Sequence, residues 1–191
     1  MSTLTAARLL PAPDVMAARA YAYALIEHRL GARWPDQVAF TFMRDRRGRQ
    51  RASYDLGNGD HIELVVEGDS AVVWGYDRRC PLASLSGPPR GLLAGLTAPA
   101  ASLLQDVASQ AMTFLLWRES GRWRRGEIDA PACPDPDGSG WLLEPWAAGA
   151  ESFATYATEA YERRVSARRV QAVIDAVAEL GTAPARLIDD V

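Results

Sequence analysis

The side chains best suited to catalysis or metal binding are few and lie far apart in the sequence. The 191-residue chain has two histidines, His28 and His61, and two cysteines, Cys80 and Cys133. Two thiols cannot complete a metal site alone, and neither histidine falls in a metal-ligand pattern. The sequence contains no Gly-x-Ser-x-Gly elbow, phosphate-binding loop or His-Glu-x-x-His motif. We therefore expect no catalytic residue, no metal and no cofactor, and predict that the protein is not an enzyme.

An acidic run from Asp135 to Gly140 has the start of a calcium-loop pattern. With Asp135 as the first ligand, Gly140 would take the turn position of the loop. The twelfth position, which requires a bidentate acid, is then Trp146. The run is therefore interpreted as a Pro/Gly/Asp turn without calcium.

Aromatic and charged residues instead form a segment suited to binding a protein. Trp74 and Tyr76 alternate onto one face of a predicted strand as rigid apolar anchors, and opposite charges follow at its end. The predicted partner surface comprises Asp60, Trp74, Tyr76, Asp77, Arg78 and Arg79. For Trp74 a core position is the alternative. We expect the charge reversals Asp77→Arg and Arg79→Glu to leave the fold intact.

A second candidate surface is the basic run from Arg44 to Arg51, which includes Arg46 and Arg47. Such runs at hairpin tips are often solvated loops, and an acidic protein partner is the functional alternative. All 21 cationic side chains of the chain are arginines, yet the formal net charge is −3. Because nucleic-acid-binding domains usually carry a large basic excess, we expect no nucleic-acid partner.

Hydrophobic periodicity predicts an α+β protein, in which an antiparallel meander sheet packs with an N-terminal helix and C-terminal helices. Helical spacing begins at Asp14 and ends at Gly31. Alternation then predicts four strands, near residues 38–42, 52–56, 62–66 and 72–76. Polar alternates such as His61 and Glu63 imply that one face of this sheet is wet or only partly covered.

The second half of the chain alternates between helix and strand signals. Pro99 is placed to open a helix. Strands are predicted from Met112 to Leu116, from Trp123 to Ile128 and over 141–143, and helices over 153–161 and 170–180. In the first half, Asn58-Gly59 predicts a two-residue type I′ turn, so Gly59 and Asp60 are expected to be structural.

Length and composition indicate one domain over residues 1–191, with residues 1–13 and 182–191 as flexible ends. Apolar residues make up 48% of the chain and charged residues 24%, as is usual for globular proteins. No apolar stretch approaches the length of a membrane span, and the N-terminus has no signal-peptide core. We expect a soluble bacterial cytoplasmic protein with free thiols and no membrane partner.

Residues 54–60, Tyr-Asp-Leu-Gly-Asn-Gly-Asp, and residues 73–77, Val-Trp-Gly-Tyr-Asp, carry a family resemblance. They resemble the SUKH superfamily, in which a Gly-Asn-Gly-Asp turn leads to a strand and then to one ending in an aromatic-Asp-His-Glu sequence. The chain is also similar to small bacterial proteins of immunity type, through Trp117-Arg118 and the Asp135–Gly138 turn. The similarity covers roughly residues 54–165. Arg78-Arg79-Cys80 stands where the pattern has His-Glu-Ser, so no role of that His-Glu pair transfers.

The resemblance implies a non-enzymatic immunity protein that binds and neutralises a cognate protein toxin, encoded by an adjacent gene. Two alternatives stay open on the sequence. One is a structural or regulatory protein-interaction module without a toxin partner. The other is a small enzyme or ligand-binding domain with a pocket near His61, Asp60 and Trp74.

Overall fold

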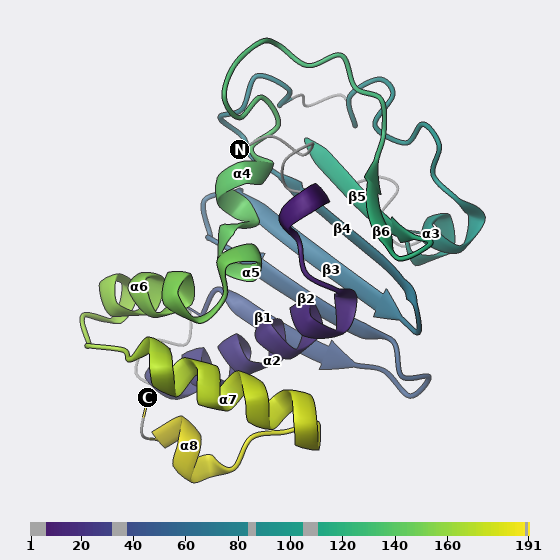
Figure 1. The fold of residues 1–191 in the computed structure, drawn as a ribbon. Helices are drawn as coiled ribbons and strands as arrows, with labels where there is room; N and C mark the ends of the chain where they lie inside the picture. The colour runs from purple at the N-terminus through teal and green to yellow at the C-terminus, as the bar shows by residue number, and fades with distance from the viewer. Residues whose placement is uncertain (1–6, 32–37, 84–86, 105–110, 190) are drawn as a thin grey trace.

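The computed structural model describes residues 7–31, 38–83, 87–104, 111–189 and 191. Six strands form one antiparallel sheet in the order β1-β2-β3-β4-β5-β6, so every strand pairs with its neighbour in sequence. The strands are β1 Phe40–Arg44, β2 Gln50–Asp55, β3 His61–Glu67, β4 Ser70–Tyr76, β5 Phe114–Glu119 and β6 Arg122–Arg125. The predicted α+β class and its four-strand meander are confirmed, and the meander continues through two more strands (Figure 1).

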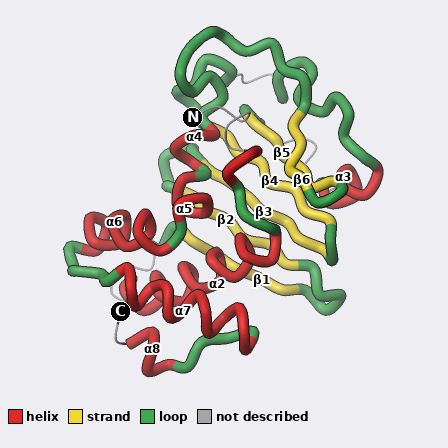
Figure 2. The backbone as a smooth tube through the Cα atoms, in the orientation of Figure 1, coloured by secondary structure: helices red, strands yellow, loops and turns green. Residues whose placement is uncertain are grey.

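Helices enclose the sheet mainly on one side, shown in red beside the yellow strands in Figure 2. They are α2 Pro13–Leu30, α3 Ala98–Leu103, α4 Ser139–Leu142, α5 Glu144–Ala148, α6 Ala150–Tyr161, α7 Ala167–Leu180 and α8 Ala185–Asp189. Helix α2 lies along β1, β2 and β3, and α7 packs against α2. Pro13 occupies the first turn of α2, where its missing N–H costs nothing.

The two faces of the sheet pack against different layers. The first face contributes Tyr54, Ile62, Leu64, Val73 and Leu116 to a large core that includes α2, α6 and α7. On the second face only the β4–β5 side is apolar and covered, by α3 and Leu92. The residues of this smaller core on the strands are Val65, Val72, Trp74, Leu115 and Trp117.

The second face is therefore half open, as the alternation of polar residues predicts. Thr41, Ser53, Glu63, Trp74 and Leu115 are successive partners across β1 to β5. Thr41 is exposed and Ser53 and Glu63 are half-buried, whereas the last two are fully buried. This row thus passes from polar residues at β1 to apolar residues at β4 and β5, where α3 and Leu92 cover the sheet.

Residues 141–143 form a helical turn, so the predicted strand there is wrong. The acidic run before them starts the helix: Asp137 Oδ1 accepts hydrogen bonds from the N–H (3.1 Å) and Oγ (2.7 Å) of Ser139. Asp135 accepts the N–H of Gly140. Carboxylates on the first free N–H groups favour a helix start. Residues 135–138 form a turn as predicted, and Ser139 and Gly140 at the end of the run begin α4.

Other boundaries also differ from the sequence prediction. Strand β6 ends at Arg125, three residues before Ile128, where Gly126 passes against the backbone of Leu92. Within the ends expected to be flexible, Leu10 lies in the large core and residues 185–189 form α8. Helix α8 contacts α2 and α7, and its Asp189 pairs with Arg29 at 2.7 Å. Both ends are therefore packed on the domain in part: Leu10 is buried in its core, and Leu187 and Ile188 of α8 are partly buried against it.

Candidate functional site

The predicted partner segment lies at the end of the sheet where β2 and β4 end and β3 and β5 begin. Three loops meet there, of residues 56–60, 77–83 and 135–138. Asp60, at the end of the first loop, is fully buried, and its Oδ1 accepts the backbone N–H of Arg78 at 2.9 Å. Its Oδ2 lies 3.9 Å from Nη2 of Arg79. Asp60 therefore joins the β2–β3 loop to the segment after β4.

Asp77 makes the second anchor of this segment. Its side chain is only 6% exposed. Oδ1 accepts the N–H of Arg79 at 2.8 Å, and Oδ2 accepts Nε1–H of Trp141 at 2.9 Å. The guanidinium of Arg79 also lies over the Trp141 ring, 5.6 Å from its centroid. One buried carboxylate thus fixes both the loop after β4 and helix α4.

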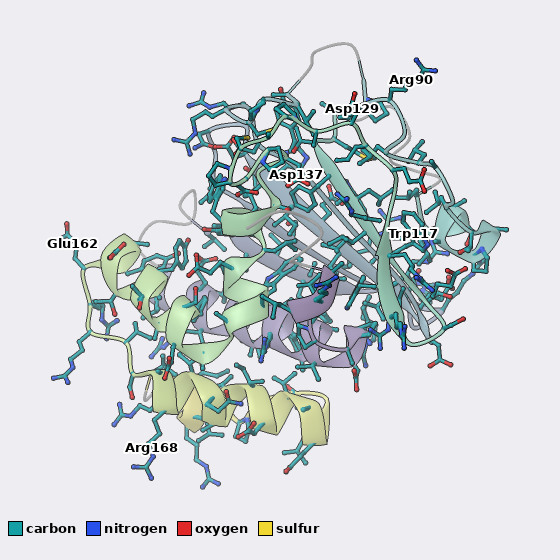
Figure 3. The ribbon with its side chains drawn as sticks, turned by 45° about the horizontal axis from the view of Figure 1, so that its top comes forward. Arg90, Trp117, Asp129, Asp137, Glu162 and Arg168 are labelled. Carbon is teal, nitrogen blue, oxygen red and sulfur yellow. The ribbon has the colours of Figure 1, made fainter. Side chains whose placement is uncertain are left out.

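Thr113 completes the connection between the loops. This buried hydroxyl accepts the backbone N–H of Asp77 at 3.1 Å and donates to the carbonyl of Asp137 at 2.7 Å. Asp137, labelled in Figure 3, lies at the junction of the α4 loop and the sheet. Gly138 has φ +74°, and a Cβ there would lie 2.3 Å from Cβ of Asp77. The loops therefore meet in a close-packed, hydrogen-bonded junction that admits only glycine at this position.

The junction leaves two cations at the surface. Arg78 and Arg79 are both exposed, and the side chain of Arg79 is 68% accessible. Their backbone N–H groups are held by Asp60 and Asp77, so their position is fixed while their guanidinium groups face outward. Beside them Tyr76 is half-buried and stacks on His61 at 6.2 Å between ring centroids. This arrangement suits the binding of carboxylates, since an arginine side chain can hold a carboxylate through two parallel hydrogen bonds.

Some residues of the predicted surface are buried in the structure and others are exposed. Trp74 is fully buried in the smaller core, so its core alternative is correct and it offers no exposed anchor. Asp60 and Asp77 are also buried and position the arginines. The expectation that Asp77→Arg leaves the fold intact is therefore wrong, because it would place a guanidinium in a closed junction. Arg79→Glu would likewise bring a second carboxylate toward Asp60.

The basic hairpin tip lies elsewhere. Arg46 and Arg47 are exposed in the β1–β2 turn, at the opposite end of the sheet from Arg78 and Arg79. Asp45 Oδ1 accepts the N–H groups of Arg47 and Arg49, which closes the turn. The two predicted arginine groups therefore belong to two separate surfaces.

The β2–β3 turn differs in detail from the predicted two-residue type I′ turn. The backbone N–H of Leu56 bonds the carbonyl of Asp60, so five residues make the connection. Gly57 and Gly59 have φ of +70° and +96°, whereas Asn58 is not at positive φ. Instead Oδ1 of Asn58 accepts the N–H of Asp60 at 2.9 Å, which orients the buried aspartate. The structural role predicted for Gly59 and Asp60 agrees with this geometry.

A polar group that sequence reasoning missed lies on the other side of the sheet. Glu27 of α2 is fully buried, and it accepts hydrogen bonds from the N–H of Phe40 and the hydroxyl of Tyr156, the latter at 2.7 Å. Burial raises the pKa of the Glu27 carboxyl, and hydrogen bonds from Phe40, Tyr156 and Tyr161 oppose that rise. Burial and the nearby Glu27 raise the pKa of Tyr54 to about 12. In the structure Glu27 lies on the buried side of α2 with Ile26 and Leu30.

A cavity of about 650 Å³ lies next to this group, between the start of β1, the β2–β3 loop and α6. Tyr156, Tyr161, Asp55 and Ser53 are among its lining residues. His61, Asp60 and Trp74 do not line it, so the pocket considered on the sequence is not the one found here. Glu27, bonded to β1 and α6, ties the helical layer to the edge of the sheet.

Comparison with protein-family models, with curated proteins and with solved structures finds no match for this chain. In the part of the chain that the structure describes, no helix combines the length and apolar character needed to cross a bilayer. The site must therefore be interpreted from its own geometry.

Proposed function

We propose that this protein is a non-enzymatic immunity-type protein that binds and neutralises a cognate toxin in the bacterial cytoplasm, the toxin being encoded by an adjacent gene. The observation that carries the proposal is the pair of exposed arginines, Arg78 and Arg79, whose backbone is held by the buried Asp60 and Asp77. A binding protein gains affinity when its contact residues are positioned before the partner arrives. The resemblance to immunity-type proteins favours a protein toxin as the partner.

The chemistry of the surface supports an acidic epitope on that partner. Arg78 and Arg79 place two positive charges side by side, with Tyr76 next to them as a half-buried aromatic group. Charges at the rim of an interface accelerate association, and an aromatic residue at its centre supplies affinity. The open half of the second sheet face, which includes Thr41, Ser53 and Glu63, continues from Tyr76 and offers further polar contacts.

Co-expression with the product of the neighbouring gene tests the proposal. The two proteins are expected to co-purify, and expression of this chain is expected to relieve the growth defect that the neighbour causes. If this chain instead neutralised the toxin as an enzyme, the product of the neighbouring gene would be covalently altered. Measurement of its intact mass detects such a change. Failure to co-purify, or relief of toxicity together with a changed neighbour mass, would contradict the proposal.

A further inference from the structure

A second cationic site lies at the outer edge of the sheet, where the β5–β6 hairpin meets residues 7–10. A cavity of about 660 Å³ occurs there, and it is lined by five arginines and no acidic residue. These arginines, here called the arginine cleft, are Arg8, Arg118, Arg122, Arg124 and Arg125. Four of them lie within residues 118–125, and the fold adds Arg8, which is more than a hundred residues away in the sequence.

Trp123 holds this cleft together. Its ring is buried in the large core, and its Nε1–H donates to the carbonyl of Pro11 at 2.8 Å, tying the hairpin to the N-terminal segment. Arg118 stands opposite Trp123 in the β5–β6 register, with its guanidinium 5.9 Å from the centre of the ring. Arg122 and Arg124 flank Trp123 on β6 and are exposed. The cleft is thus fixed by backbone pairing and by one buried aromatic residue.

The charges of the cleft are only partly balanced within the described chain. Glu119 Oε2 lies 3.5 Å from Nε of Arg124, and both side chains are substantially accessible. An exposed pair of this kind contributes little to stability. Arginines gathered around one cavity repel each other, so a carboxylate group entering it relieves that repulsion and gains charge-assisted hydrogen bonds.

The edge position of β6 indicates the shape of the ligand. β6 is the last strand of the sheet, and among the described residues its only strand partner is β5. An extended peptide can align along such an edge through its backbone while its side chains contact the neighbouring residues. Nucleic acid fits less well, because single-strand binding depends on exposed aromatic platforms and the one aromatic residue lining the cleft, Trp123, is buried.

We propose that the arginine cleft binds an extended, carboxylate-rich segment of a protein partner. The cleft is at the outer hairpin, apart from the junction of Arg78 and Arg79, so this proposal does not depend on the function proposed above. It identifies a second interaction surface, with a ligand class set by guanidinium chemistry and by an edge strand that pairs with no described strand other than β5.

The probe is a fluorescein-labelled glutamate decamer, with binding followed by fluorescence anisotropy at low ionic strength. The wild-type chain is expected to bind it, and Arg122→Glu to bind about tenfold more weakly, with affinity falling as salt is added. Arg168→Glu is the matched control: it makes the same change in net charge on the exposed α7 surface, away from the hairpin, and is expected to retain wild-type affinity. Circular dichroism melts verify that both variants are folded.

Three outcomes overturn the proposal. The first is no binding of the decamer to the wild-type chain. The second is an equal loss in both variants, which would mean attraction by total charge only. The third is tighter binding of an oligothymidylate of equal charge, which would make the cleft a nucleic-acid site.

Discussion

Trp141 donates a hydrogen bond from Nε1 to Oδ2 of Asp77 at 2.9 Å, across 64 residues of sequence. Through it α4 is joined to the segment that presents Arg78 and Arg79, since the other oxygen of the same carboxylate holds the N–H of Arg79. The position of the exposed arginines therefore depends on a helix that contributes no residue of the predicted surface. Packing around Trp141 and binding at the arginines should consequently be coupled.

Replacing Trp141 by Phe keeps an aromatic ring and removes the donor to Asp77. A buried carboxylate oxygen left without its partner costs about 1–3 kcal/mol, so the free energy of unfolding should fall by that amount. In an Asp77→Ala background the same replacement should cost less, because the acceptor is already absent. Urea unfolding of the two single variants and the double variant measures this; additive losses would show that the hydrogen bond does not contribute.

Replacing Gly59 by Val should destabilise the protein through the backbone alone. Gly59 has φ +96°, and a Cβ there would meet no atom within 4 Å. A β-branched residue at this φ costs about 1–3 kcal/mol, whereas Asn tolerates positive φ better. The melting temperature should therefore fall more for Gly59→Val than for Gly59→Asn. If Gly59→Val has the melting temperature of the wild type, residue 59 does not have the positive φ described for the β2–β3 loop.

Replacing Glu27 by Gln should change how stability depends on pH. The pKa of Glu27 is raised above its ordinary value of 4.5, chiefly by burial, so the folded state binds the proton more tightly than the unfolded state. Its favourable contribution is complete below the ordinary pKa and is lost as pH rises through the raised pKa. The groups facing it are Tyr54, Tyr156 and Tyr161, whose pKa values are also raised, so they stay neutral in this range.

The free energy of unfolding of Glu27→Gln, relative to wild type, should therefore increase from acidic to neutral pH. Urea unfolding between about pH 4 and pH 8 measures this. Glu159→Gln, an exposed carboxylate on the same helix as Tyr156, should show no comparable trend. A relative stability of Glu27→Gln that decreases with pH would mean that the hydrogen bonds outweigh burial.

The two thiols should react at different rates. Cys80 is buried and Cys133 is exposed, and burial raises the pKa of the Cys80 thiol. Because the thiolate is the reactive form, a thiol reagent at neutral pH should modify Cys133 first and Cys80 only slowly or after unfolding. Mass spectrometry of the labelled chain, with Cys133→Ser as the control, distinguishes the sites. Equal rates would contradict the packing described around Cys80.

Much of the fold follows from sequence periodicity, whereas the site does not. The alternation around Ile62 and Leu64 placed the meander correctly, because these residues enter the large core while His61 and Glu63 stay half-buried on the other face. The short apolar run over 141–143 has no period that distinguishes strand from helix, and the deciding contacts come from Asp135 and Asp137. The burial of Glu27 depends on Tyr156, 129 residues away, so a helix analysed alone places this carboxylate at the surface.

The central claim is that exposed Arg78 binds an acidic surface of the cognate toxin. Titration calorimetry against the purified product of the adjacent gene tests it most directly, with Arg78→Glu compared with Arg47→Glu at the opposite end of the sheet and Arg168→Glu on α7. We expect Arg78→Glu to weaken binding about tenfold and to reduce its dependence on salt, while the other two variants bind like the wild type. Wild-type affinity of Arg78→Glu at low salt, or a loss confined to Arg47→Glu, would contradict this account.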